Sequence, residues 1–573
     1  MKRIVILLLI ATVTVARADD SKIAPELRGY PSNQQANIIV QYAPGTQLSC
    51  SGLLGLVGCL LNDILQLGGT ILGDLPLING VVAQLDGNGI VSLSNQSNVL
   101  YISPDRVLTP NLSNAAPAVN AFAAWQSGYT GTGIGVALVD SGVSTHPDLN
   151  GGFRGGSRVV WNQSFIPGNS STNDQYGHGT HIAGLIAGDG ASSTGANYSR
   201  TFQGIAPGAN LVNLRVLDQN GAGTDSSVIA AINTAIALKQ RFNIRVMNLS
   251  LGREVYESYR LDPLCQAVEA AWKNGIVVVV SAGNNGRTQA ADGYGTVTSP
   301  GNDPYVITVG AMKPMGTPTR VDDLIASYSS KGPTAGDAVV KPDVVAPGNL
   351  LVSLEAPNST LYNEFSTNQV PYSYYVNGGS SASSSSYFTL SGTSMAAGVV
   401  SGAVADLLQK SPRLTPDQVK ARLMKTAWKS LPSYSSYTDP VSGVTYTDQY
   451  DIFTVGAGYV DIEAALVNTD LASGTAMSPI AQFNSSTNTV FLKTDRSAVW
   501  NTSATWSNAA VWGSSQFVVG SAAITATGTQ SMLSGSNVLW GGNALWGGNA
   551  LWGGNALWGG NALWGGSVPT GEN

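Results

Sequence analysis

The chain has 573 residues, and only 11% of them are charged, against roughly 25% in an average soluble domain. The formal net charge is -6, from 29 basic and 35 acidic residues with no basic block, so the composition argues against nucleic acid as the main partner. The length exceeds that of one ordinary domain and predicts one large folded unit with flanking segments.

The first residues indicate export. Lys2 and Arg3 precede an apolar run at residues 4–15, which leads into the small-residue cleavage pattern ARA. We interpret residues 1–18 as the signal peptide of a secreted, extracellular protein. The alternative is an uncleaved anchor, but about a dozen apolar residues fall short of the roughly 20 that span a bilayer, so we expect no transmembrane anchor.

Export permits disulfides, yet the chain has only three cysteines, Cys50, Cys59 and Cys265. Cross-links therefore cannot be the main source of its stability. Cys50 and Cys59 can pair with each other, whereas Cys265 is expected to be a buried structural thiol.

Residues 19–112 contain two strand-like runs, at 38–42 and 99–102, around a middle that is rich in Leu and Gly. We expect this segment to form a small independent α+β unit. From about residue 115 the pattern changes to apolar runs that alternate with amphipathic helices.

That alternation is typical of a mostly parallel sheet with helices on both faces, and continuous apolar runs suit its central strands. We therefore predict a three-layer α/β fold over residues 113–470. The expected strands are 134–139, 211–216, 244–248 and 276–280.

Capping signals mark two helix starts in this region. Asp262 is followed by proline, and Thr415 is followed by proline and, three residues after the cap, by Gln418. A stretch at 353–387, rich in Ser, Tyr and Asn, has no consistent period. We interpret it as a long, mobile surface insertion.

Three glycine-containing motifs carry candidate catalytic residues. The strand GVALVDSGV delivers Asp140 at its carboxyl end, where open parallel sheets place binding and catalytic groups. In GHGTHIAGLIAG, glycines flank His178 just before a helix of small residues and let neighbouring backbone approach the ring. In SGTSMAAGVV, Ser394 begins a long helix whose free amide groups can help bind a developing anion. A carboxylate, an imidazole and a hydroxyl in these settings indicate nucleophilic catalysis.

The three motifs, in the order Asp, His, Ser, resemble those of the subtilisin-like serine protease family. The resemblance covers about residues 115–466 and includes the segments GIAPGANL, NLSLG, SAGNNG, KPDVVAPG and GAGYVD in the expected order. It implies a subtilisin-like fold and a serine endopeptidase that acts on proteins or peptides. Asp140, His178 and Ser394 would then form the catalytic triad.

The same resemblance implies further site residues. Asn284 in SAGNNG is expected to donate to the oxyanion together with the backbone amide of Ser394. The segments around residues 221–223 and 250–252 resemble the two edges that hold an extended peptide by strand addition. The residues carried over for this role are Gly221, Gly223, Ser250, Leu251 and Gly252.

In one motif the chain departs from the family. Where the family follows GTSMA with a small residue, proline and histidine, this chain has AGV at residues 397–399, which puts the pocket geometry in doubt and leaves the reaction type unaffected. The remaining histidines are His146, in a loop that resembles one of the family, and His181. We interpret His181 as a packing or hydrogen-bonding residue on the helix of His178.

Metal chemistry has weaker support. His178 and His181 lack the Glu and the spacing of HExxH, and no cysteine cluster suggests zinc. Asp148 lies in the HPDL loop, through which family members often bind structural calcium, but residues 188–202 do not match the family's calcium loop. We expect that the chemistry requires no cofactor and leave structural calcium open.

Residues 19–112 resemble the family's inhibitory propeptide, with ANIIVQY as a first strand and VLYISPDRVL near the end, although the Leu/Gly-rich middle departs from the usual pattern. The resemblance implies that this unit assists folding, is cut between about residues 107 and 118, and then inhibits the enzyme until it is degraded. We therefore expect a zymogen that processes itself.

Residues 471–573 end in a repeat array, which we interpret as separate from the catalytic core. Trp500, Trp506 and Trp512 keep a six-residue interval in a degenerate form, and near-perfect LWGGNA copies follow. These copies hold Trp540, Trp546, Trp552, Trp558 and Trp564. A second hypothesis follows: an inactive family relative that contacts a cell surface, a glycan or other copies of itself through exposed Trp rings. A spacer without a ligand is the alternative role of the array.

Overall fold

The computed structural model describes residues 19–24, 27–43, 60–75, 79–104, 115–152, 155–288, 293–484, 489–501, 504–512, 563–564 and 571–572. The chain divides into two compact units, residues 1–109 and 110–573. The predicted signal peptide, Cys50, Cys59 and the regular tail repeats up to Trp558 lie outside the described residues.

The first unit contains a four-stranded antiparallel sheet in the order β2-β3-β1-β4. Its strands are β1 (Gln35–Tyr42), β2 (Thr70–Leu75), β3 (Gly80–Asp86) and β4 (Val99–Pro104), and its helices are α1 (Leu60–Gln66) and α2 (Gly87–Ser94). The two predicted runs are confirmed as parts of β1 and β4, which pair with each other. Helices α1 and α2 and strands β2 and β3 form within or beside the Leu/Gly-rich middle. They were not predicted, because periodicity does not distinguish a short apolar strand from a helix segment.

The second unit is built on a sheet in the order β12-β11-β10-β9-β5-β7-β6, with β13 paired to β11. Its strands are β5 (Gly135–Asp140), β6 (Val159–Ser164), β7 (Asn210–Arg215), β9 (Ile244–Leu249), β10 (Val277–Ser281), β11 (Ile307–Lys313), β12 (Leu324–Ile325) and β13 (Val344–Pro347). Only β12 is antiparallel to its neighbour. The four predicted strands are confirmed as β5, β7, β9 and β10, which are adjacent at the centre of the sheet.

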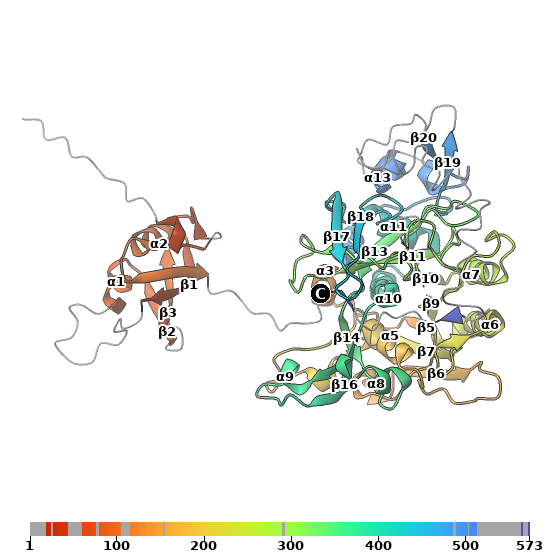
Figure 1. Ribbon diagram of the computed structural model, residues 1–573, viewed down its shortest axis with the longest axis horizontal. Helices are drawn as coiled ribbons and strands as arrows, with labels where there is room; N and C mark the ends of the chain where they lie inside the picture. Colours follow the sequence, from red (N-terminus) through yellow and green to blue (C-terminus); the bar gives the residue numbers. More distant parts are fainter. Residues whose placement is uncertain are drawn as a thin grey trace, which may run out of the picture. The chain divides into compact units, whose positions relative to one another are not determined.

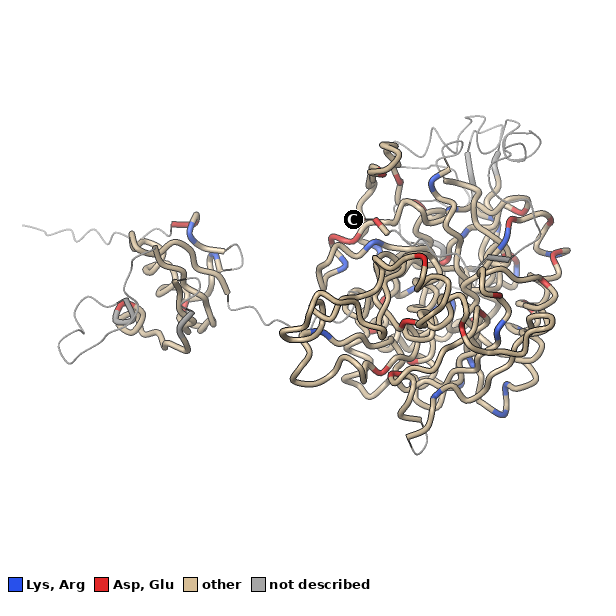
Figure 2. Tube along the Cα trace, turned by 60° about the horizontal axis from the view of Figure 1, so that its bottom comes forward, with Lys and Arg blue, Asp and Glu red and all other residues tan. Residues whose placement is uncertain are grey.

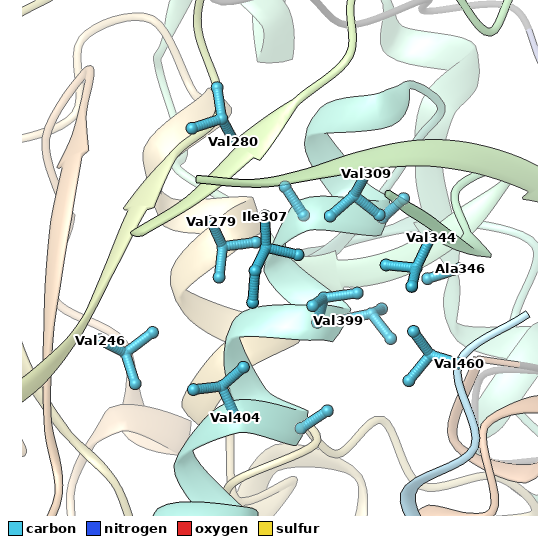
Figure 3. Close-up of a cluster of buried hydrophobic side chains, with 14 of the residues drawn as sticks. Val246, Val279, Val280, Ile307, Val309, Val344, Ala346, Val399, Val404 and Val460 are labelled. Carbon is cyan, nitrogen blue, oxygen red and sulfur yellow. The ribbon is translucent and has the colours of Figure 1, made fainter. Parts of the chain in front are cut away.

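Helices flank this sheet (Figure 1). Helices α5 (His178–Ala187) and α10 (Thr393–Lys410) pack against each other, and α10 contacts β9, β10, β11 and β13. Helix α6 (Asp225–Phe242) packs against α7 (Pro263–Lys273) and contacts β5, β7 and β9. Figure 3 shows Val399 and Val404 of α10 beneath Val279 and Ile307 of the sheet. The predicted three-layer α/β fold is confirmed.

Both predicted helix starts are confirmed. The Asp262 carboxylate caps α7 by accepting from Leu264 N at 2.9 Å. Thr415 and Gln418 form a reciprocal capping box at the start of α11 (Pro416–Thr426). The remaining helices are α3 (Ala115–Ala118), α4 (Ala121–Gln126), α8 (Thr360–Glu364), α9 (Tyr372–Tyr375), α12 (Ile462–Val467) and α13 (Asn508–Trp512).

The stretch at 353–387, which we interpreted as a long surface insertion, contains regular structure. It contributes to a three-stranded antiparallel sheet of β14 (Leu351–Leu354), β16 (Ser383–Leu390) and β15 (Gln369–Pro371). Tyr375 and Tyr387 are buried and pack edge to face. Pairing between distant strands and burial of aromatic rings organise this region, and neither leaves a local sequence period.

Three tail tryptophans also differ from expectation. Trp500, Trp506 and Trp512 are buried and belong to the same hydrophobic cluster as the central sheet. Trp500 Nε1 donates to the carbonyl of Met477 at 2.7 Å, and the Trp500 and Trp512 rings meet edge to face. The degenerate repeats are therefore part of the second unit's core, because each ring buries a large apolar area there.

Charged residues are few, and Figure 2 shows the acidic and basic positions interspersed along the Cα trace. Among the residues that the structure describes, every helix is too short or too polar to span a bilayer. Cys265 is a free, buried thiol, as predicted. Antiparallel hairpins complete the second unit: β17 (Tyr434–Thr438) with β18 (Thr445–Gln449), and β19 (Ile480–Asn484) with β20 (Thr489–Lys493).

A buried charge cluster joins the KPDVVAPG segment to helix α11. The Asp343 carboxylate binds Lys341 Nζ at 2.7 Å and Lys420 Nζ at 3.1 Å, and all three side chains are fully buried. Lys420 Nζ also donates to the carbonyls of Pro304 and Val306. Burial lowers the pKa of Lys420 to about 7, although the charge of Asp343 opposes this.

Removal of the central anion should destabilise the fold. Asp343→Asn leaves two buried ammonium groups without their counter-ion, which costs about 3–5 kcal/mol of unfolding free energy. Urea unfolding, followed by circular dichroism, measures the change. The control Lys273→Gln removes an exposed pair with Glu269, and we expect it to cost less than about 1 kcal/mol. Equal losses in the two variants would contradict a structural role for the cluster.

Candidate active site

The carboxyl end of β5 positions Asp140 beside His178. Asp140 Oδ1 lies 2.8 Å from His178 Nδ1, and both side chains are fully buried. The same oxygen accepts from the backbone N–H of Ser141 at 2.7 Å. A carboxylate acceptor at Nδ1 means that this ring nitrogen carries the proton, so Nε2 is left as the basic nitrogen.

Glycine next to His178 permits this approach. A Cβ at Gly179 would lie 2.2 Å from the carbonyl oxygen of Gly142 and 3.2 Å from Cβ of Asp140. The residue before the ring, Gly177, adopts φ +107°, a conformation that other residues rarely adopt. The glycines of GHGTH therefore let the start of α5 lie directly against the end of β5.

Asp174 and Ser141 organise the start of α5, and sequence reasoning missed both. Asp174 accepts from Gly177 N at 2.7 Å and from Thr180 N at 2.8 Å, so it satisfies amides that the first helical turn leaves open. Ser141 Oγ lies 2.8 Å from Asp174 Oδ1 and 3.2 Å from Asp140 Oδ1, and it accepts from Gly179 N. The only sequence signal was an acidic residue four positions before His178.

The electrostatics favour a basic ring at His178. Burial lowers the pKa of His178, but the charge of Asp140, its hydrogen bond and the charge of Asp174 outweigh this, so the pKa lies above 6.5. Within the described part of the chain, His178 Nε2 is a buried nitrogen without a hydrogen-bond partner.

The other two histidines hold structure together. His181 Nε2 lies 3.0 Å from the carbonyl of Leu351 and 3.1 Å from that of Phe388, and burial lowers the pKa of His181 to about 3. The prediction that it is a hydrogen-bonding residue is confirmed. His146 accepts from Asp148 N through Nδ1, so its Nε2 donates to the carbonyl of Ser386 at 3.1 Å.

Ser394 is in the first turn of α10, a helix that begins directly after Gly392, and this glycine adopts φ +149°. Its Oγ donates to the carbonyl of Ser250 at 3.3 Å, and Ser250 Oγ donates to the carbonyl of Ser394 at 2.9 Å. Asn248 Nδ2 in turn donates to Ser250 Oγ at 2.9 Å. The carboxyl end of β9 is therefore bonded to the start of α10.

Asn284 lies beside the same helix start. Its Oδ1 accepts from Thr393 N at 2.9 Å and from Thr393 Oγ1 at 3.1 Å. Gly283 N donates to Thr393 Oγ1 at 3.1 Å, which fixes the loop after β10. With the amide oxygen held by the residue before Ser394, the amide nitrogen is the group that Asn284 can offer as a donor.

The two predicted peptide edges are in different parts of this site. Gly221 precedes the short strand β8 (Ala222–Gly223), and a Cβ there would lie 2.7 Å from the ring of Tyr176, next to His178. Ser250, Leu251 and Gly252 follow β9, where Ser250 bonds to Ser394. One edge is thus beside the candidate base and the other beside the candidate nucleophile.

Comparison with known proteins identifies the family. The sequence model of the subtilase family matches residues 131–460. The chain belongs to the subtilase family. Serine protease AprX of Bacillus subtilis is 38% identical over 354 residues, which cover 60% of this chain and 73% of AprX. Subtilisin E of Bacillus subtilis is 34% identical over 371 residues, 64% of this chain and 79% of its own length.

This subtilase is accordingly a serine-type endopeptidase, and its substrates are proteins or peptides. M-protease of Shouchella clausii is a further relative, 31% identical over 399 residues that cover 69% of this chain and 81% of that protein. The departure at 397–399 leaves α10 regular: a Cβ at Gly398 would lie 3.4 Å from Ile182 and Leu185 of α5, an ordinary contact.

The Asp148 carboxylate accepts hydrogen bonds from two neighbouring segments. Its Oδ1 accepts from Ser192 N at 2.8 Å and its Oδ2 from the Tyr387 hydroxyl at 2.7 Å. Among the described residues, no group of three or more His, Cys, Asp or Glu side chains could hold a metal ion. Structural calcium stays open.

The pH dependence of the subtilase should report His178. We expect kcat/KM to fall on the acid side with a midpoint above pH 6.5, because Asp140 raises the pKa of His178 and a protonated ring cannot accept the proton of Ser394. Asp140→Asn removes the charge and the correct tautomer, so the midpoint should move to lower pH and kcat should fall about 10⁴-fold.

Rate profiles on a short peptide substrate measure both effects. The exposed residue Asp322 supplies the control, because Asp322→Asn should change neither kcat nor the midpoint. An unchanged midpoint in Asp140→Asn would show that the carboxylate does not control the ring.

Proposed function

We propose that this subtilase is secreted as a precursor, processes itself, and cleaves peptide bonds through an acyl-enzyme on Ser394, with His178 as the base and Asp140 as its partner. The observation that carries the proposal is the buried contact of 2.8 Å between Asp140 Oδ1 and His178 Nδ1. It supports a neutral ring whose second nitrogen is available for the proton of a hydroxyl.

Acylation begins with the proton of the nucleophile. The Ser394 hydroxyl gives up its hydrogen bond to the carbonyl of Ser250 and passes its proton to His178 Nε2, because hydrogen bonds between catalytic groups often tighten only when substrate binds. As the proton moves, Oγ attacks the peptide carbonyl carbon and the carbonyl π electrons move to oxygen. Asn284 Nδ2 and the backbone amide of Ser394 then donate to the resulting oxyanion.

Collapse of the tetrahedral intermediate breaks the carbon–nitrogen bond. Protonated His178 gives its proton to the leaving amine, and Asp140 stabilises the imidazolium in the meantime. A water molecule then gives up a proton to His178 and attacks the ester. The acid product leaves, and the proton returns to Ser394.

The first unit supports the role of a propeptide. It has a hydrophobic cluster of its own, which includes Ile38, Val40 and Ile102. The boundary between units, at residues 109 and 110, lies within the predicted cleavage region of about 107–118. A unit with a separate core can fold alone, bind the enzyme as an inhibitor and be released after cleavage.

The structure limits which tryptophans can take part in the proposed surface or glycan contact. Trp500, Trp506 and Trp512 are buried, so they offer no exposed ring for a glycan or a cell surface. Any such contact would depend on the regular repeats from Trp540 onward. A truncation near residue 495 would remove core residues, whereas one near residue 535 would leave them in place, so the latter tests surface or polymer binding without loss of the fold.

Loss of the oxyanion donor should reduce turnover. For Asn284→Ala we expect kcat to fall about 100- to 1,000-fold with KM changed little, the cost known for loss of one such donor in a subtilisin. Steady-state kinetics give both constants. The matched control Asn285→Ala alters the neighbouring asparagine, whose backbone amide bonds to Ser330 Oγ. A KM change of equal size would indicate that Asn284 binds the ground state instead.

Replacement of the nucleophile tests self-processing. Ser394→Ala, expressed in a protease-free host, should accumulate as the full precursor, because no acyl-enzyme can form. Intact mass spectrometry measures the product. The wild-type protein should react with a serine-directed fluorophosphonate at Ser394. Normal processing of Ser394→Ala would contradict self-cleavage, and label on another serine would contradict the assigned nucleophile.

A further inference from the structure

Two short pieces of the C-terminal tail contact the catalytic unit, and the first continues the peptide-binding edge. Leu563 and Trp564 form strand β21, which pairs antiparallel with β8, Leu563 opposite Gly223 and Trp564 opposite Ala222. This is the edge predicted to hold an extended peptide. The tail therefore occupies it in the manner of a substrate, by main-chain pairing.

The second contact buries Glu572, whose side chain is 1% exposed. Its Oε1 lies 2.9 Å from Ser327 N and 3.0 Å from Arg287 Nη2, and it also accepts from Ser327 Oγ. A carboxylate with one cationic and two neutral donors around it is held by charge-assisted hydrogen bonds, which are stronger than neutral ones.

The main chain of Glu572 is held as well. Asn349 Nδ2 donates to the carbonyl of Glu572 at 2.7 Å, and Glu572 N donates to Asn349 Oδ1 at 2.9 Å. The Asn349 amide thus forms hydrogen bonds with both the N–H and the carbonyl of one residue, as a neighbouring strand would. Gly571 fits tightly before it, since a Cβ there would lie 2.4 Å from Ser391 Oγ. Ser391 is three residues before Ser394.

The pocket around the carboxylate is constructed from distant segments. Arg287 Nε donates to Ser327 Oγ at 2.9 Å, which fixes the guanidinium beside that serine. The guanidinium also lies over the rings of Tyr437, at 5.0 Å, and Tyr446, at 5.6 Å, on the β17–β18 hairpin. Ser327 and Asn349 are buried. These contacts hold Arg287 in place without Glu572, so they do not depend on the tail.

The direction in which the tail runs indicates on which side of the cleaved bond this pocket lies. The chain meets β8, beside His178, at residue 564 and reaches Ser391, beside Ser394, at residue 571. A peptide that binds in the same direction has the residues before its cleaved bond on β8. Residues after that bond then reach Asn349 and Arg287.

We propose that Arg287, Ser327 and Asn349 form a carboxylate-binding subsite for an acidic residue on the leaving-group side of the substrate, and that Glu572 occupies it in the intact chain as an internal competitor. The proposal rests on the proposed function, cleavage at Ser394. A tethered ligand competes at an effective concentration of about millimolar, so the intact chain is partly self-occluded.

The experiment uses the full chain and quenched peptides that carry Glu or Gln at each of the first positions after the cleaved bond. Glu572→Gln should raise kcat/KM on all peptides about tenfold, the value of a charge-assisted hydrogen bond in binding. It should also favour the best-placed Glu peptide over its Gln counterpart about tenfold. In Glu572→Gln/Arg287→Gln that preference should vanish.

Exposed residues supply matched controls: Glu364→Gln and Arg413→Gln remove the same charges elsewhere, and neither should alter rate or preference. A direct measurement avoids turnover. The Ser394→Ala chain is first cut between about residues 107 and 118 with an added protease and freed of the first unit, because the uncleaved precursor would keep its inhibitor. Calorimetry should then show tighter binding of the Glu peptide by Glu572→Gln than by the parent chain.

The outcomes separate two failures. Equal binding of the Glu and Gln peptides in Glu572→Gln, with normal fluorophosphonate labelling of Ser394, overturns the subsite and leaves the proposed function intact. No labelling and no hydrolysis in any chain with Ser394 overturns the proposed function, while a binding preference for Glu in the Ser394→Ala background would still support the subsite.

Discussion

A buried imidazole can serve as a base at neutral pH only if the cost of its burial is offset by a nearby negative charge. Asp140 supplies that charge to His178 at 2.8 Å, in a place where both side chains are fully buried. Burial alone would drive the pKa of the ring down, and Asp140 with Asp174 reverses the direction. The neighbouring structure serves to keep this pair in register: glycine at 179 permits the approach, and Ser141 ties the strand end to the helix start.

The candidate nucleophile is also held in place by surrounding residues. Ser394 begins a helix that is packed beneath the sheet, and its position is set by bonds to residues far away in sequence. Ser250, which lies 144 positions earlier in the chain, forms a hydrogen bond with Ser394. Asn248 forms a hydrogen bond with Ser401, further along the same helix. Because Asn248 lies near the end of the central strand β9 and Ser250 follows it, the helix start and the strand end cannot move independently. A rigid frame of this kind keeps the cost of organising the reacting groups low.

The tail shows how the same groove can serve two purposes. Backbone pairing on β8 does not depend on side chains, so a segment of the chain itself can bind to the edge that is proposed to hold substrate. The pocket around Glu572 adds chemical selectivity, since Arg287 and Asn349 recognise a carboxylate and a peptide backbone together. In the proposed arrangement, the contacts that hold the tail and restrain activity are of the same kind as those that would select a substrate: backbone pairing and carboxylate recognition.

By itself, the sequence determined the α/β class, the four central strands, two helix caps and the candidate triad, because each depends on local features: apolar runs, capping residues and motif glycines. Tertiary structure alone decided the rest. The sheet within 353–387, the burial of Trp500 and the contact of Glu572 with Arg287 depend on residues far apart in the chain. Asp174 belongs with them, since its role comes from the amides it meets after folding. Non-local pairing leaves no period in the sequence, so only the folded chain brings these partners together.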